Sequence, residues 1–199
     1  ISRALTVRKV VHTSSIAAVV RYADAPRHTF TEADWNTEST LATDPYGVAK
    51  TEAERAMWRA HAAQTGADVP WQLVTLNPVV VFGPVYTKAH CKGSNLTLRE
   101  LISGAYPAAP PIHLGLVDVR DVAIAHAEAV ERDDADGRHI LCAQGQWMAE
   151  VAQVLRREFP DYKVPRFTLP AAAMYAMSLV GKRLSFAMAR RLVNNPVQV

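Results

Sequence analysis

Short apolar runs alternate with longer amphipathic stretches along this chain. The run over residues 8–13 predicts a buried strand that leads into small hydroxyl residues, and a second apolar run predicts a strand over residues 71–76. Between them, residues 45–64 are mostly good helix formers and predict a helix. Strand, helix and strand in this order predict one crossover unit of a parallel sheet.

The start of the predicted helix has clear local signals. Thr43 and Asp44 are residue types that cap helices, and Pro45 suits the first helical position. The helix is expected to end near Gly66. The residues just after Pro45 therefore have predictable positions on the helix surface.

The later part of the chain predicts a mixture of short elements. An apolar run over residues 79–82 follows Asn77, a candidate turn residue, and Pro78. Asp118 is a candidate helix cap, and Pro160 is expected to end another helix. The remaining predicted elements are helices over residues 94–104, 119–132 and 147–159, a strand over residues 138–142, and a last helix over residues 169–180.

The candidate chemistry begins with Tyr46 and Lys50. Side chains four residues apart lie on one face of a helix, so the phenol and the ammonium group can face a common cleft. A tyrosine with the ordinary pKa of about 10 is a poor base at neutral pH, but a nearby cation favours the phenolate form. Ser15 follows the first predicted strand, at the sheet edge where open α/β folds gather their ligand groups. The three residues together predict proton transfer to or from a substrate oxygen.

Each of these residues also has a simpler interpretation. A tyrosine four residues before a lysine arises by chance on many solvated helix faces. Ser15 could satisfy backbone groups at the strand end, and a structural role is the favoured interpretation for His126. The position of Tyr46 and Lys50 after a strand and its hydroxyl residues is what favours the catalytic interpretation.

Five blocks of this sequence occur in the order found in one known family. They are residues 10–16 (VVHTSSI), 30–36 (FTEADWN), 45–54 (PYGVAKTEAE), 77–84 (NPVVVFGP) and 117–123 (VDVRDVA). The chain resembles the extended short-chain dehydrogenase/reductases of the NAD-dependent epimerase/dehydratase superfamily. Within them it is most similar to the dihydroflavonol reductase and cinnamoyl-CoA reductase-like branch, and the resemblance runs to about residue 170.

The resemblance implies an NAD(P)-dependent oxidoreductase that transfers hydride between the nicotinamide and a carbonyl or alcohol carbon of a small-molecule substrate. Tyr46 would give or take the hydroxyl proton, and Ser15 would hold the substrate oxygen. Lys50 would bind the ribose hydroxyls and favour the phenolate. The implied cofactor is NAD or NADP, and the residues expected to contact it are Tyr46, Lys50, Pro78, Val79, Val80 and Ser94.

One feature of the family is missing from this sequence. The Rossmann sheet of the family opens with a glycine-rich phosphate loop. No G-x-x-G-x-x-G or G-x-G-x-x-G spacing is present in this sequence. We therefore expect the C-terminal part of a longer enzyme. The expected fold is α/β: a partial Rossmann-like, doubly wound parallel sheet with a small C-terminal substrate-binding lobe. Residues 1–84 would belong to the dinucleotide-binding domain and 85–199 mainly to the substrate lobe, with a helix and strand over about 118–143 returning to the sheet.

Composition changes this interpretation little. The 199 residues are 49% hydrophobic, which predicts a globular protein, and the net charge of +3 comes from dispersed basic residues that do not favour nucleic-acid binding. Cys91 and Cys142 have neither metal-ligand nor disulfide spacing, which favours a reduced cytoplasmic protein with no metal. The apolar stretch 171–181 is about half of the roughly twenty residues that a membrane span requires, so no membrane partner is expected.

Two other classes of function stay open. The first is a nucleotide-sugar epimerase or a 3β-hydroxysteroid dehydrogenase-like enzyme, which the substrate lobe would decide. The second is a non-catalytic, truncated remnant that has kept the catalytic residues but lost cofactor binding.

In the family's strand order, residues 8–13 would lie beside a strand that this sequence lacks. Such an exposed strand edge predicts self-association of the chain.

Overall fold

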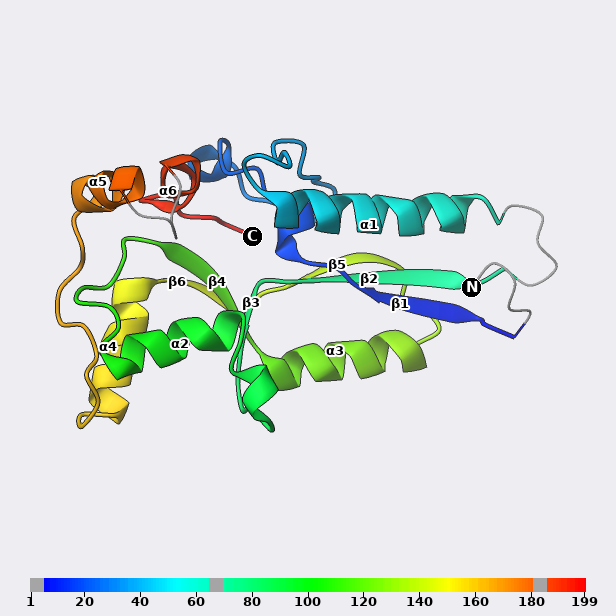
Figure 1. Cartoon of the computed structure of the whole chain (residues 1–199). Helices are drawn as coiled ribbons and strands as arrows, with labels where there is room; N and C mark the ends of the chain where they lie inside the picture. Colours follow the sequence, from blue (N-terminus) through cyan, green and yellow to red (C-terminus); the bar gives the residue numbers. More distant parts are fainter. Residues whose placement is uncertain (1–5, 65–69, 181–185) are drawn as a thin grey trace.

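The strands of the computed structural model, which describes residues 6–64, 70–180 and 186–199, form two sheets (Figure 1). The elements in chain order are β1 (Lys9–Thr13), η1 (Ile16–Ala18), η2 (Ala25–Arg27), α1 (Pro45–Ala62), β2 (Gln72–Pro78), β3 (Val80–Phe82), η3 (Lys88–His90), α2 (Ser94–Ser103), β4 (His113–Asp118), α3 (Val119–Glu131), β5 (Gly137–Leu141), β6 (Gln144–Trp147), α4 (Met148–Glu158), α5 (Ala171–Val180) and α6 (Phe186–Leu192). No helix among these described residues combines the length and apolar character needed to cross a bilayer.

The first sheet is parallel, with the strand order β1-β2-β5. Helix α1 covers one face and α3 covers the opposite face (Figure 1). In the register, Val11 lies opposite Val74, and Leu76 lies opposite His139. Val74 and Leu76 are buried with Ala129 of α3 in one apolar cluster. Parallel strands with crossover helices on both faces confirm the expected doubly wound α/β arrangement.

The second sheet has the order β3-β4-β6, with β3 parallel and β6 antiparallel to β4. Val79 alone separates β2 from β3, so one extended segment contributes to both sheets. Leu101 of α2 packs with Met148 and Val151 of α4, and half-buried residues of β4 complete this cluster. The expected division of the chain at residue 84 stays a prediction.

The start of α1 agrees with its sequence signals. The helix begins at Pro45, and the Asp44 side chain caps it by accepting a hydrogen bond from the Gly47 N–H group. Gly66, where the helix was expected to end, lies outside the described residues. The helix expected over residues 169–180 is present as α5, but it is not the last helix, because α6 follows it.

Two strands and one buried amide had no clear sequence signal. Gly115 of β4 lies opposite Gly145 of β6, and glycine is depleted in strands, so neither segment predicts a strand. A Cβ atom at Gly115 would lie 2.9 Å from Cγ1 of Val79, so close packing explains this glycine.

The interpretation of Asn77 as a turn residue is wrong, because it lies within β2 and is fully buried.

Strand β1 has a free edge within the described part of the chain. The N–H of Gln72 donates to the Arg8 carbonyl and the N–H of Ser14 donates to the Leu76 carbonyl, both at 2.8 Å. Successive backbone groups of a strand in a parallel sheet point in opposite directions. The N–H of Val11 therefore faces away from β2, toward the edge that no described strand occupies.

A buried carboxylate of α1 joins this helix to the first sheet. Glu54 is fully buried, and it accepts hydrogen bonds from Ser14 Oγ at 2.5 Å and from Asn77 Nδ2 at 2.8 Å. Arg138 of β5 donates from Nε to its second oxygen, also at 2.5 Å. Because a buried charge is costly unless it is paired and hydrogen-bonded, these three partners are needed together.

Arg138 in turn fixes the loop before α1. Its guanidinium carbon lies 3.9 Å from the centre of the Trp35 ring, and its Nη1 donates to the carbonyl oxygens of Glu32 and Asp34. A planar guanidinium can stack on an aromatic face and donate in its own plane at the same time, which lysine cannot do.

Glu54→Gln tests how much of the stability depends on this ion pair. Because the change leaves Arg138 buried without its counter-charge, we expect a loss of about 3–5 kcal/mol in the free energy of unfolding. Thermal unfolding followed by circular dichroism measures it. Glu52→Gln is the matched control on the same helix, where the carboxylate is exposed and its loss should change stability by less than about 0.5 kcal/mol. Equal melting temperatures for the two variants would contradict this account.

Candidate active site

Ser15 lies just beyond the carboxyl end of β1. Its backbone is extended, with φ −164° and ψ 154°, and its Oγ accepts a hydrogen bond from the Ala17 N–H at 3.2 Å. Ser15 therefore satisfies a backbone group, as the simpler interpretation expects, and its part in catalysis stays a prediction. Because the hydroxyl only accepts in this contact, its own proton is left to donate elsewhere.

Tyr46 is the second residue of α1 and is 59% exposed, which is unusual for an aromatic side chain so close to the core. Asp44 orients this turn by accepting from Gly47 N–H at 3.0 Å and from Ser39 Oγ at 2.7 Å. Burial raises the pKa of Asp44, but these hydrogen bonds together with Arg191 outweigh it and lower the pKa below its ordinary value. The carboxylate is therefore ionised at neutral pH, as a cap requires.

Lys50 connects α1 to the end of β1. Its Nζ lies 6.0 Å from the centre of the Tyr46 ring and donates to the carbonyl oxygens of Thr13 and Ser14, both at 3.4 Å. These are its hydrogen bonds among the described residues, and an ammonium group has three donors. One donor is left for a ligand beside Tyr46.

A cavity of about 520 Å³ brings most of the predicted site residues together. Its lining includes Ser15, Tyr46, Val79, Val80 and Ser94. This volume is in the usual range for a ligand site.

Two predicted residues lie outside that lining. Lys50 is near the cavity, because its Nζ lies 6.0 Å from the centre of the Tyr46 ring. Pro78 is buried as the last residue of β2, where it pairs with Leu141, and its expected contact with the cofactor stays a prediction. The expected structural role of His126 agrees with its contacts to Thr13 Oγ1 and the Val122 carbonyl, both at 2.8 Å.

The cavity also has walls that sequence reasoning missed. Tyr22 comes from the loop after β1, and Arg191 and Leu192 come from α6. The Arg190–Arg191 pair is visible in the sequence as a basic pair, but no spacing relates it to residues far earlier in the chain.

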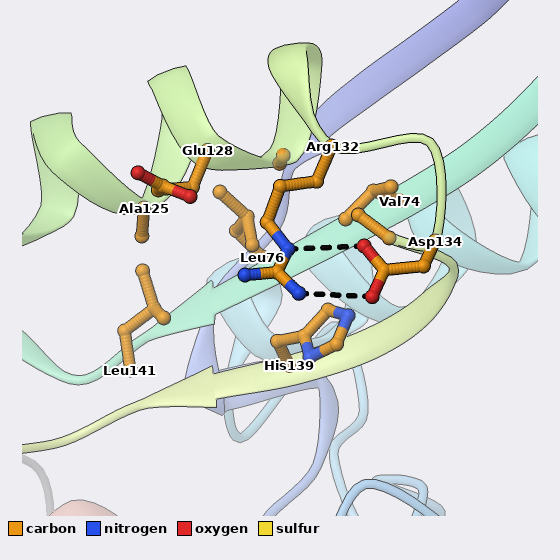
Figure 2. A pocket seen from close by; sticks show the side chains of 10 residues that line it. Val74, Leu76, Ala125, Glu128, Arg132, Asp134, His139 and Leu141 are labelled. Atoms are coloured by element: carbon orange, nitrogen blue, oxygen red, sulfur yellow. Dashed lines mark hydrogen bonds and ion pairs between the residues drawn. The ribbon is translucent and has the colours of Figure 1, made fainter.

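A second cavity, of about 390 Å³, lies between α3 and the first sheet (Figure 2). Its floor is apolar and includes Leu76 and Leu141, and two of its charged residues, Arg132 and Asp134, form an ion pair. Arg132 donates to both oxygens of Asp134, at 3.0 and 2.8 Å. None of the predicted site residues lines it, and within the described ranges no cluster of three or more histidine, cysteine or acidic residues could hold a metal.

A parallel sheet flanked by helices, with a cavity at the carboxyl ends of its strands, defines a Rossmann-like α/β protein. A sequence model of the NAD dependent epimerase/dehydratase family matches residues 1–143, and the chain belongs to this family. The predicted family is therefore confirmed.

Several of the relatives are reductases. A cinnamoyl-CoA reductase from Medicago truncatula is 36% identical over 168 residues, which cover 80% of this chain and 48% of the relative. An NADPH-dependent methylglyoxal reductase from Saccharomyces cerevisiae is 32% identical over 171 residues, covering 79% and 50%. The crystal structure of yeast methylglyoxal/isovaleraldehyde reductase complexed with NADPH superposes with a TM-score of 0.73 at 30% identity, covering 81% of this chain and 51% of that one. The predicted branch is confirmed, and this chain spans about half the length of these relatives.

Gly47→Ala tests the geometry of the helix start. In an ordinary helix, alanine is more favourable than glycine by about 1 kcal/mol. At this position, however, a Cβ atom would lie 2.0 Å from Asp44 Oδ2 and 2.6 Å from Ser39 Oγ. We expect Gly47→Ala to lower the melting temperature, because displacing a cap costs about 0.5–2 kcal/mol. As a control, Ala56→Gly on the exposed side of α1 should also destabilise, by about 0.5–1 kcal/mol. A Gly47→Ala variant that melts higher than the parent would contradict the proposed cap geometry.

Proposed function

We propose that this chain forms the catalytic part of an NAD(P)-dependent reductase that acts on small carbonyl compounds. The observation that supports the proposal is that Ser15 and Tyr46 line one cavity, with the Lys50 ammonium 6.0 Å from the Tyr46 ring. Three groups that can bind and protonate a carbonyl oxygen therefore meet at one place.

Tyr46 is the proposed proton donor and acceptor. Its hydroxyl has no hydrogen-bond partner among the described residues, so it is available to a substrate oxygen. The Lys50 charge stabilises the negative charge that develops on the phenol oxygen when the proton leaves. Ser15 donates its proton to the same substrate oxygen and orients it, because its hydroxyl accepts from Ala17 N–H and keeps its one donor free.

The cavity fits the nicotinamide end of a dinucleotide. Val79 and Val80 provide an apolar wall, Ser94 provides a hydroxyl, and Lys50 has a donor for a ribose hydroxyl. When bound, a nicotinamide cofactor supplies the hydride. The sequence has no glycine-rich phosphate loop, so we assign to this chain the nicotinamide and ribose side of the cofactor site.

The proposed substrates are aldehydes, ketones or the corresponding alcohols. The related proteins are a cinnamoyl-CoA reductase and a methylglyoxal reductase, and both substrates contain a reactive carbonyl group. The proposed site requires a carbonyl oxygen, which Ser15 would hold beside Tyr46. Both of these substrates have such an oxygen.

Tyr46→Phe, made in the complete protein, tests this function. Because the phenol is the proton carrier, we expect turnover to fall by about 10²-fold or more while cofactor affinity changes little. Lys50→Met should weaken both turnover and cofactor affinity, because the ammonium serves both. Stopped-flow NADPH oxidation with an aldehyde and fluorescence titration of the cofactor are the measurements.

The control is Tyr86→Phe, which removes a phenol that is 86% exposed and outside the cavity, and it should retain parental turnover. Mild and equal effects of the Tyr46 and Lys50 changes would argue for an ordinary solvated helix face. Cofactor binding that is absent even from the complete protein would favour the non-catalytic remnant.

We also propose that the 199-residue chain by itself associates through the free edge of β1. The exposed N–H of Val11 offers a pairing position to a second chain. Val11→Pro removes that donor and should shift the chain from oligomer to monomer in light scattering. Val10→Pro is the matched control: it removes a donor that faces β2 and should lower the melting temperature instead. A monomeric parent chain would contradict the proposal.

A further inference from the structure

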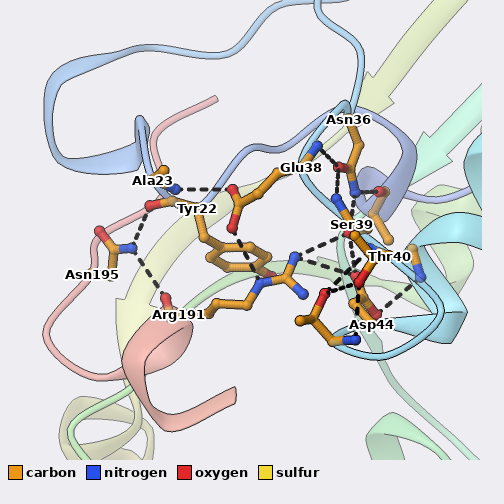
Figure 3. A network of polar contacts seen from close by, with 12 residues as sticks. Tyr22, Ala23, Asn36, Glu38, Ser39, Thr40, Asp44, Arg191 and Asn195 are labelled. Carbon is orange, nitrogen blue, oxygen red and sulfur yellow. Dashed lines mark hydrogen bonds and ion pairs between the residues drawn. The ribbon is translucent and has the colours of Figure 1, made fainter. Parts of the chain in front are cut away.

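Arg191 connects the C-terminal helix to the loop that precedes α1 (Figure 3). Only 12% of its side chain is exposed. Its Nη2 donates to Ser39 Oγ at 3.1 Å and to Asp44 Oδ2 at 3.3 Å, and its Nε lies 3.6 Å from Glu38 Oε1. Its guanidinium carbon lies 4.8 Å from the centre of the Tyr22 ring, so the group is held on several sides.

The backbone behind Arg191 is also fixed. Asn195 donates from Nδ2 to the Arg191 carbonyl at 3.0 Å and to the Tyr22 carbonyl at 2.6 Å (Figure 3). The end of α6 is therefore attached to the loop after β1, and Arg191 has little freedom to leave its position.

One branch of this network leads from Arg191 to Tyr46. Ser39 donates from Oγ to Asp44 Oδ2 at 2.7 Å, and Asp44 accepts from Gly47 N–H with its other oxygen. This carboxylate sets the first turn of α1, in which Tyr46 is the second residue. Asp44 therefore lies between Arg191 and the turn that carries Tyr46.

A second branch leads to Ser15. Asn36 is 4% exposed, and its Nδ2 donates to Ser39 Oγ at 2.8 Å and to the Ala17 carbonyl at 2.7 Å. The N–H of the same Ala17 donates to Ser15 Oγ. Ser39 thus uses its one donor and both acceptor positions, and it connects the two branches.

The charges show why this position needs a guanidinium. Two carboxylates, Glu38 and Asp44, face a single cation, so Arg191 is neutralised within the protein. Without it, two partly buried carboxylates would lie together with no counter-charge. A role as the binding group for an anionic substrate is therefore disfavoured, although Arg191 lies in the cavity wall.

We propose that Arg191 is a positioning residue, which holds Tyr46 through Asp44 and Ser15 through Ser39 and Asn36 in the arrangement that protonates a substrate oxygen. The proposal rests on the function proposed above. Under this proposal, α6 contributes to catalysis without contacting the reacting atoms. Turnover then depends on the C-terminal segment, whereas cofactor binding does not.

The test compares Arg191→Met with Arg191→Lys in the complete protein. Because a small displacement of a catalytic group lowers the rate steeply, we expect Arg191→Met to lower kcat by about 10- to 100-fold per folded molecule. The KM for the aldehyde and the affinity for NADPH should change little. Arg191→Lys should recover part of kcat, because it restores a cation between the two carboxylates. Arg190→Met is the matched control, since Arg190 is the exposed neighbour on the same helix, and it should behave like the parent.

A double-mutant cycle with Asp44→Asn separates positioning from a general loss of structure. If Arg191 acts through Asp44, the double variant should lose less activity than the product of the two single effects. Multiplicative losses, or a fall in kcat explained entirely by a smaller folded fraction, would overturn the proposal. An Arg191→Met enzyme that keeps kcat while Tyr46→Phe loses it would overturn the positioning role alone. An unaffected Tyr46→Phe enzyme would overturn the proposed function itself.

Discussion

The buried carboxylate of Glu54 constrains the part of the first sheet that borders the candidate site. It is stable in the core only when the Ser14 hydroxyl just beyond β1, the Asn77 amide near the end of β2 and the Arg138 guanidinium near the start of β5 reach it together. These three positions must therefore keep a fixed relation to one another and to α1. Ser14 is adjacent to Ser15, and Glu54 lies on the same helix as Tyr46, so this single requirement places both candidate catalytic groups.

The site combines this rigid sheet with parts of the chain that are remote in sequence. The segment that leaves β2 at Val79 enters the second sheet directly, so Val79 and Val80 line the cavity without an intervening loop. Other lining residues are Tyr22 and, from α6, Arg191 and Leu192. The strand ends and α1 thus hold the proposed chemical groups, and the polar network around the Arg191 guanidinium is proposed to position them.

Local signals were sufficient to predict part of the site. The helix cap, the spacing of Tyr46 and Lys50 and the strand end before Ser15 each act over a few residues, and the structure has all three. Asn77 looked like a turn residue because its buried partner, Glu54, is 23 residues away and makes no local pattern. The role of Arg191 depends on contacts with residues about 150 positions earlier, which no periodicity or motif encodes. The strands β4 and β6 could not be predicted, because their paired glycines have a low propensity for strands. These glycines are explained by close packing, which the sequence does not reveal.

The separation of Glu54 and Arg138 by 84 positions also bears on the order in which the chain can assemble during synthesis. Helix α1 and strands β1 and β2 leave the ribosome well before β5, and a carboxylate is poorly accommodated in a core without its cation. Burial of Glu54 against the sheet is therefore unfavourable until residue 138 has been synthesised. We expect α1 to take its final place on the sheet only after β5 has been made.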